Sequence, residues 1–79
     1  MSNTEKLIRT FAETLQIEAA RVTEDLSYNA IAEWDSVGHM ALIAALEEAF
    51  GVMLDTDDII DLSSVAQAKT ILAKYDVAF

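Results

Sequence analysis

The stretch WDSVGHMALIAALEEAFG, from Trp34 to Gly51, predicts one helix with both of its ends marked. Asp35 or Ser36 supplies the N-terminal cap, because a short polar side chain there accepts a hydrogen bond from a free N–H group of the first turn. Gly51 is the residue expected just past the C-terminal end, where the backbone turns left-handed. The longest apolar run lies inside this helix, from Met40 to Leu46, and is far shorter than the roughly 20 residues of a membrane span. We therefore expect a helix of a globular domain, without membrane insertion.

Two further helices are predicted near the ends of the chain. The first begins around residues 2–4 with a capping box, Ser2 to Glu5, and ends around residues 16–18. The last opens with a second capping box, Ser64 to Gln67, and continues through Tyr75. Both segments carry apolar side chains at helical spacing, which predicts that each buries one face against the rest of the domain.

A third, short helix and one long loop complete the predicted fold. The short helix follows Asp55 or Thr56, whose side chains can cap its first turn. Residues 19–35 lack sustained periodicity and predict a long loop, fixed to the core by Val22, Leu26, Tyr28, Ile31 and Trp34. The fold class is therefore all-α: a small four-helix bundle with a long loop between its first two helices and a short third helix. Its 79 residues form a single domain, residues 1–79.

The composition restricts the chemistry that the chain can perform. Apolar residues make up 53% of the sequence, which is enough for a packed core. The chain has no cysteine, so it offers no disulfide, no thiolate nucleophile and no zinc site of the usual kind. The polar start MSNTEKLIRT does not resemble a secretory signal. We expect a cytoplasmic monomer and not an enzyme, because so small a domain has little stability to offset a deep, water-free active site.

The acidic residues are concentrated in the middle of the chain. The net charge is −9, and the segment from Val22 to Ala68 contains ten acids and no lysine or arginine. Nucleic acids and anionic membranes would be repelled by such a segment. A basic protein surface would be attracted to it, although the acidity also has the simpler interpretation that it keeps the protein soluble.

The central helix divides into two faces at roughly 100° per residue. The face predicted to enter the core holds Leu42, Ile43, Ala45, Leu46, Ala49 and Phe50. The opposite face holds Ser36, Val37, Met40, Ala41, Ala44, Glu47 and Glu48. An apolar strip rimmed by carboxylates on a helix facing solvent is typical of a docking surface. In the alternative interpretation, Val37 and Met40 pack under the preceding loop.

Two catalytic or metal-binding interpretations are disfavoured by the residues themselves. Asp35, Ser36 and His39 contain the ingredients of a hydrolytic triad, but the base would need an orienting group, an oxyanion hole and a pocket. His39 also falls toward the core face, which favours a half-buried, hydrogen-bonded histidine. The acidic run from Asp55 to Asp61 lacks the glycine and glutamate of a calcium-binding EF-hand loop, and acids are favoured at a helix N-terminus in any case.

Ser36 is better interpreted as a modification site. Its hydroxyl lies at a helix N-terminus beside a capping carboxylate, where the helix dipole and backbone N–H groups favour an anion. A phosphodiester attached there fits these physical demands, and so does simple phosphorylation. Gly38, two residues further on, is expected to loosen the first turn, at a cost of up to about 1 kcal/mol relative to alanine.

Several motifs in fixed order now point to a known family. They are Asp35-Ser36-Val37 followed by Met40, the helix end LEEAFGV at residues 46–52, the acidic short helix, and Ser-Val at the start of the last helix. This set spans essentially the whole chain and resembles the acyl carrier proteins and the related aminoacyl and peptidyl carriers. The resemblance implies a four-helix bundle with a long first loop.

The resemblance further implies that Ser36 is the attachment point of 4′-phosphopantetheine. A separate, magnesium-dependent phosphopantetheinyl transferase would supply the group from coenzyme A and recognise the motif aspartate, Asp35. The thiol of the arm would carry acyl or aminoacyl groups as thioesters, in place of the missing cysteine. The positions implied in partner docking are Val37, Met40, Ala44, Glu47 and Glu48. Further implied partners are a loading ligase for acyl or aminoacyl groups and downstream synthases or transferases with basic docking surfaces.

The residues around the motif are similar to those of a particular group of carriers. Trp34 precedes the motif and Gly38-His39 follows it, whereas carriers of fatty acid synthesis tend to have acids just after the motif. The pattern is closer to stand-alone carriers of specialised pathways, such as polyketide, nonribosomal-peptide or aminoacyl-transfer systems. The alternative hypothesis is a helical interaction module of the same fold that is not phosphopantetheinylated.

Overall fold

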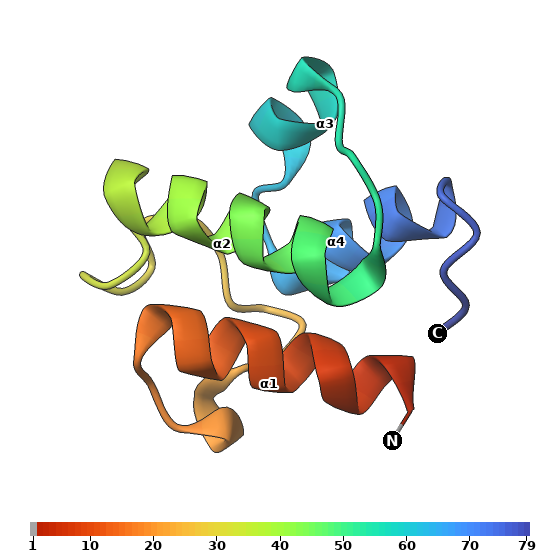
Figure 1. Ribbon diagram of the computed structural model, residues 1–79. Helices are drawn as coiled ribbons and strands as arrows, with labels where there is room; N and C mark the ends of the chain where they lie inside the picture. The colour runs from red at the N-terminus through yellow and green to blue at the C-terminus, as the bar shows by residue number, and fades with distance from the viewer. Residues whose placement is uncertain (1) are drawn as a thin grey trace.

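The computed structural model describes residues 2–79 and confirms the predicted all-α fold (Figure 1). Its elements are α1 (Asn3–Leu15), the 3₁₀ turn η1 (Ala19–Arg21), α2 (Ser36–Phe50), α3 (Thr56–Asp61) and α4 (Val65–Ala73). Helices α1 and α2 run antiparallel, α4 lies behind α2 in this view, and the short α3 stands beside α2 on the side away from α1 (Figure 1). No helix within residues 2–79 has the length and apolar character needed to cross a membrane.

The helix ends form mostly where the local sequence places them. Ser2 accepts the backbone N–H of Glu5 at 3.1 Å, and Ser64 accepts that of Gln67 at 3.0 Å, so both predicted N-terminal caps are confirmed. Gly51 ends α2 in the left-handed conformation with a φ of 63°, as predicted. These ends are decided by contacts over three or four residues, which explains why the sequence alone predicts them.

The short helix begins where it was predicted, directly after Asp55, but its predicted side-chain cap and the predicted end of the last helix were wrong. Asp55 occupies the N-cap position of α3, but its side chain makes no capping hydrogen bond. Helix α4 ends at Ala73, so Tyr75 lies in the turn that follows and not in the helix. The tyrosine hydroxyl instead accepts a hydrogen bond from the backbone N–H of Asp55 at 3.2 Å. This long-range contact provides a partner for the N–H group at the N-cap position of α3.

The core is formed by the inner faces of α1, α2 and α4 together with the long loop. Its largest fully buried side chain is Trp34, whose ring meets Phe11 of α1 edge-on with the centroids 5.4 Å apart. The other core side chains are Leu7, Leu15, Val22, Leu26, Leu42, Ile43, Leu46, Leu54, Leu62, Val65, Ala68, Ile71, Leu72 and Val77. Burying a large aromatic side chain from a loop is worth several kcal/mol at about 25 cal/mol per Å². Trp34 therefore fixes the end of the loop just before α2.

The long loop between α1 and α2 is ordered by short turns and by the linker between α3 and α4. Val22 and Leu26 are buried as predicted. The backbone N–H of Val65 donates to the carbonyl of Leu26 at 3.0 Å, and that of Tyr28 donates to the carbonyl of Ser63 at 2.9 Å. Tyr28, which was predicted to fix the loop to the core, is instead 37% exposed, and its hydroxyl is hydrogen-bonded to the exposed Ser36.

Helix α3 is attached to the end of α4 by a buried carboxylate. Asp58 is 4% exposed, and its two oxygens accept hydrogen bonds of 2.5 Å from the Lys74 ammonium and the Tyr75 hydroxyl. The hydrogen bond from Lys74, followed by that from Tyr75, holds the pKa of the Asp58 carboxyl below its ordinary value. The same contact raises the pKa of Lys74 and the pKa of Tyr75. The ionised carboxylate is thus the form that the folded state favours.

Removing this carboxylate is expected to change how stability depends on pH. A lowered folded-state pKa contributes stability above the unfolded value of about 3.9, and that contribution is lost as the pH falls through the folded value. We predict that Asp58→Asn is less stable than the wild type at neutral pH, and that its free energy of unfolding declines less steeply in acid. Urea unfolding between pH 7 and pH 2 measures both effects.

The matched control is Asp57→Asn, which removes an exposed carboxylate from the same turn of α3. Its stability is expected to fall by less than that of Asp58→Asn, because an exposed charge near a helix N-terminus contributes only about 0.3–1 kcal/mol. Equal profiles for Asp58→Asn and Asp57→Asn would show that the buried contact does not stabilise the fold.

Candidate functional site

The predicted modification site lies at the first residue of α2. Ser36 is exposed, whereas Trp34, two residues earlier, is completely buried. Between them, Asp35 caps the helix: its Oδ1 accepts the backbone N–H of Gly38 at 2.8 Å, and its carbonyl accepts that of His39 at 2.7 Å. Ser36 is thereby held between a buried anchor and a capped helix, and its hydroxyl is presented to solvent from a fixed backbone.

Gly38 permits a close approach that the sequence did not reveal. A Cβ atom at this position would lie 2.3 Å from the carbonyl oxygen of Glu33, which is a backbone atom and cannot move aside cheaply. The glycine therefore lets the chain before α2 fold against the first turn of the helix. Glycine at this position costs helix stability, but any residue with a Cβ atom would clash with the Glu33 carbonyl and prevent this close approach.

His39 joins three parts of the protein. Its Nδ1 accepts the indole N–H of Trp34 at 3.0 Å, and its Nε2 lies 2.8 Å from the carbonyl oxygen of Ile59 in α3. An indole N–H can only donate, so Nδ1 is the unprotonated nitrogen and Nε2–H donates to the carbonyl. The histidine is half-buried and hydrogen-bonded, as predicted. With both ring nitrogens occupied, it offers no base for Ser36.

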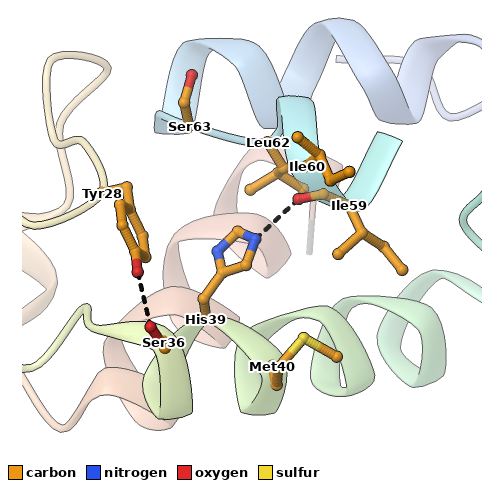
Figure 2. Close-up of a pocket in the computed structure, with 8 residues that line it drawn as sticks. All are labelled: Tyr28, Ser36, His39, Met40, Ile59, Ile60, Leu62 and Ser63. Carbon is orange, nitrogen blue, oxygen red and sulfur yellow. Dashed lines mark hydrogen bonds between the residues drawn. The ribbon is translucent and has the colours of Figure 1, made fainter. Parts of the chain in front are cut away.

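The Ser36 hydroxyl is hydrogen-bonded to Tyr28 in the long loop. The two hydroxyl oxygens are 3.0 Å apart, and either can be the donor. Figure 2 shows this hydrogen bond as a dashed line. Sequence reasoning missed this residue as part of the site, since Tyr28 was expected in the core. The two residues are eight positions apart in a segment without periodicity, so no local pattern brings them together.

An apolar pocket of about 340 Å³ opens beside Ser36, between α2 and α3 (Figure 2). It is lined by Tyr28, Ser36, His39, Met40, Ile59, Ile60, Leu62 and Ser63. The hydrogen bond from His39 to Ile59 crosses this region and fixes α3 relative to α2. The site therefore combines an exposed hydroxyl with an adjoining space for an apolar group.

The outer face of α2 is exposed along most of its length. Val37 is 79% exposed and Met40 is 57% exposed, so neither packs under the loop. Ala44 and Glu48 are exposed as well. Glu47 differs from the other predicted docking positions, because it is half-buried and its Oε2 accepts the backbone N–H of Leu54 at 2.9 Å.

The acids of α3 serve different purposes. Asp57 lies exposed in the first turn, where the helix dipole favours a negative charge. Asp58 is the buried partner of Lys74. Across residues 2–79, no group of three or more acidic or histidine side chains is arranged to hold a metal ion.

One comparison with known proteins identifies the family of this chain. A sequence model of the family described as the phosphopantetheine attachment site matches residues 5–72, and the chain belongs to this family. Its members carry 4′-phosphopantetheine covalently and act as carriers. A search of curated proteins finds no match to the chain.

The residues at the head of α2 fit such a group. The hydroxyl of Ser36 is accessible, and the capped helix end presents a favourable dipole to a phosphodiester. The lining of the adjoining pocket is compatible with apolar parts of an arm or its cargo. When bound, the group supplies the thiol that this cysteine-free chain lacks.

The role assigned to Gly38 leads to an unusual expectation for stability. Helix propensity alone predicts that Gly38→Ala stabilises the protein by about 1 kcal/mol. The contact with the Glu33 carbonyl predicts the opposite sign, a loss of about 1–3 kcal/mol, because the backbone must shift. Urea unfolding decides between them. The control, Val37→Ala at the neighbouring exposed position, should be neutral or slightly stabilising, and a Gly38→Ala protein more stable than the wild type would refute the close approach.

Proposed function

We propose that this protein is a non-enzymatic carrier in which Ser36 holds 4′-phosphopantetheine and presents acyl or aminoacyl groups to partner enzymes in the cytoplasm. The observation that carries the proposal is the exposed Ser36 hydroxyl at the capped head of α2, in a chain that belongs to a phosphopantetheine-carrying family. In the loading reaction, Ser36 Oγ forms the bond to phosphorus while coenzyme A loses adenosine 3′,5′-bisphosphate. The serine proton passes to a base on the transferase.

The residues around Ser36 have different roles in the proposed carrier. Asp35 caps the helix and marks the site for a phosphopantetheinyl transferase. Trp34 and His39 keep the head of α2 in place, so that partners meet a rigid surface. Neither ring nitrogen of His39 is free to act as a base, which supports a carrier that leaves the chemistry to its partners.

The proposed docking face consists of Val37, Met40, Ala44, Glu47 and Glu48. The two large apolar side chains are well exposed and Glu48 stands free at the far end of the face, an arrangement suited to a partner with an apolar centre and a basic rim. Such partners include the transferase, a loading ligase, and downstream synthases or transferases. Ile60 of α3 is 71% exposed and lines the same pocket as Met40, and we add it to this face.

The residues flanking the serine support a proposal about the pathway. Trp34 and His39 are hydrogen-bonded to each other, and Gly38 allows the first turn of α2 to lie against the carbonyl of Glu33, just before Trp34. The pattern of Trp34 before the motif and Gly38-His39 after it resembles stand-alone carriers, and on this resemblance the protein is assigned to a specialised biosynthetic pathway. The cargo arrives from an acyl- or aminoacyl-activating ligase.

Modification of Ser36 is tested by co-expression with a promiscuous phosphopantetheinyl transferase and intact-mass measurement. The wild type is expected to gain the mass of one phosphopantetheine group, and Ser36→Ala none. Ser63→Ala is the matched control, because Ser63 is exposed and lines the same pocket. It should be modified like the wild type. An unmodified wild type would favour an interaction module of the same fold that carries no prosthetic group.

Docking is tested by reversing one charge on the face. Glu48→Lys is expected to weaken binding to the transferase about two- to tenfold and to flatten its salt dependence, as for an exposed charge at an interface rim. Glu48 is preferred to Glu47, whose carboxylate also holds the loop after α2. Glu18→Lys makes the same charge change in the loop after α1 and should leave binding nearly unchanged. An equal effect of both variants would show that only net charge matters.

A further inference from the structure

We propose that Tyr28 is a positioning residue for the prosthetic group: its phenolic O–H donates a hydrogen bond to the phosphodiester on Ser36 and holds the root of the arm at the mouth of the pocket between α2 and α3. This inference rests on the proposed modification of Ser36. It concerns a residue outside the Asp-Ser motif, contributed by the long loop.

The starting observation is the contact between two hydroxyl groups at the site. The oxygens of Tyr28 and Ser36 are 3.0 Å apart, and the tyrosine side chain is directed at the serine (Figure 2). The tyrosine side chain is 37% exposed and therefore accessible to water. Burial alone does not force its hydroxyl to bond to Ser36.

The tyrosine is held in this direction from several sides. Its backbone N–H donates to the carbonyl of Ser63 at 2.9 Å. Its ring meets His39 edge-on with the centroids 5.5 Å apart and meets Trp34 edge-on at 6.5 Å. Both neighbouring rings are themselves joined by the hydrogen bond from the indole to Nδ1. The phenol is therefore placed before any group is attached, and little side-chain freedom is lost when it binds.

Attachment of the group decides which hydroxyl donates. In the unmodified protein either oxygen can be the donor. Once Ser36 Oγ is esterified it has no proton, so the phenol becomes the donor of the pair. The esterified serine brings anionic phosphate oxygens into the same place, and hydrogen bonds to an ionised acceptor are shorter and stronger than neutral ones. Tyr28 thus gains a better acceptor when Ser36 is modified.

The contact between Tyr28 and Ser36 lies at the rim of the pocket, where it can orient the arm. Tyr28 and Ser36 both line the apolar pocket, on which Met40 and Ile60 also border. A phosphodiester held by the phenol directs the arm from the rim of this pocket. Without the phenol, the root of the arm rotates more freely about the serine side chain.

The test compares modified wild type, Tyr28→Phe and Tyr75→Phe. Tyr75→Phe is the matched control, since it removes a phenolic hydroxyl that bonds Asp58 instead of Ser36. We expect the ³¹P resonance of the phosphodiester to shift in Tyr28→Phe and to stay in place in Tyr75→Phe. Modification is also expected to increase the folding equilibrium constant. The factor of increase should be about two- to tenfold larger in the wild type than in Tyr28→Phe.

A measurement on the wild type alone keeps the proposal open to refutation if the variant folds poorly. Nuclear Overhauser effects between the Tyr28 ring protons and the methylene group next to the phosphate are expected in the modified protein. Their absence, or an unchanged ³¹P resonance in folded, modified Tyr28→Phe, overturns the role of Tyr28 while leaving the carrier function intact. Failure of the wild type to be modified at all would instead refute the proposed function.

Discussion

The indole N–H of Trp34 needs a hydrogen-bond acceptor inside the protein, and His39 provides it. A tryptophan buried without such an acceptor would lose roughly 1–3 kcal/mol for the unsatisfied group. The acceptor lies on the second turn of α2, so burying the loop residue also fixes the helix. The second nitrogen of the same ring donates to the carbonyl of Ile59 and carries the constraint on to α3. Trp34 and His39 are five residues apart, whereas Ile59 lies twenty residues beyond His39, so one imidazole connects the end of the loop and the start of α2 to α3.

Helix α3 depends on polar contacts because it is too short to be held by propensity or by a broad apolar face. Its six residues receive the bond from His39 on one side and the bonds from Lys74 and Tyr75 to Asp58 on the other. Between these two attachments, α3 stands beside α2 and leaves the apolar pocket open next to Ser36 (Figure 2). The same hydrogen bonds therefore hold α3 rigidly against the rest of the protein and leave Ser36 accessible. A carrier that meets several enzymes through one surface needs both properties.

The sequence predicted the features that depend on neighbours within one helical turn. The caps at Ser2, Asp35 and Ser64 and the helix end at Gly51 are of this kind. The features it missed join residues that only the tertiary fold brings together. The sequence did not distinguish Asp58 from the neighbouring acids, because its partners Lys74 and Tyr75 lie in the turn after α4. Tyr28 was predicted to fix the loop to the core, and its contact with Ser36 was not foreseen. The helical pattern gave the correct outer face of α2, but it could not show that the Glu47 carboxylate turns back to the loop.

The central claim is that Trp34, His39 and Ile59 form one connected chain of hydrogen bonds that holds the site together. The most direct measurement is the ¹⁵N resonances of the His39 ring in uniformly labelled protein at neutral pH, together with exchange of the Trp34 indole proton. The account predicts a neutral ring with its proton on Nε2, an unprotonated Nδ1, and an indole proton that exchanges slowly with solvent. A proton on Nδ1, or an indole proton that exchanges as fast as in an exposed tryptophan, would contradict it.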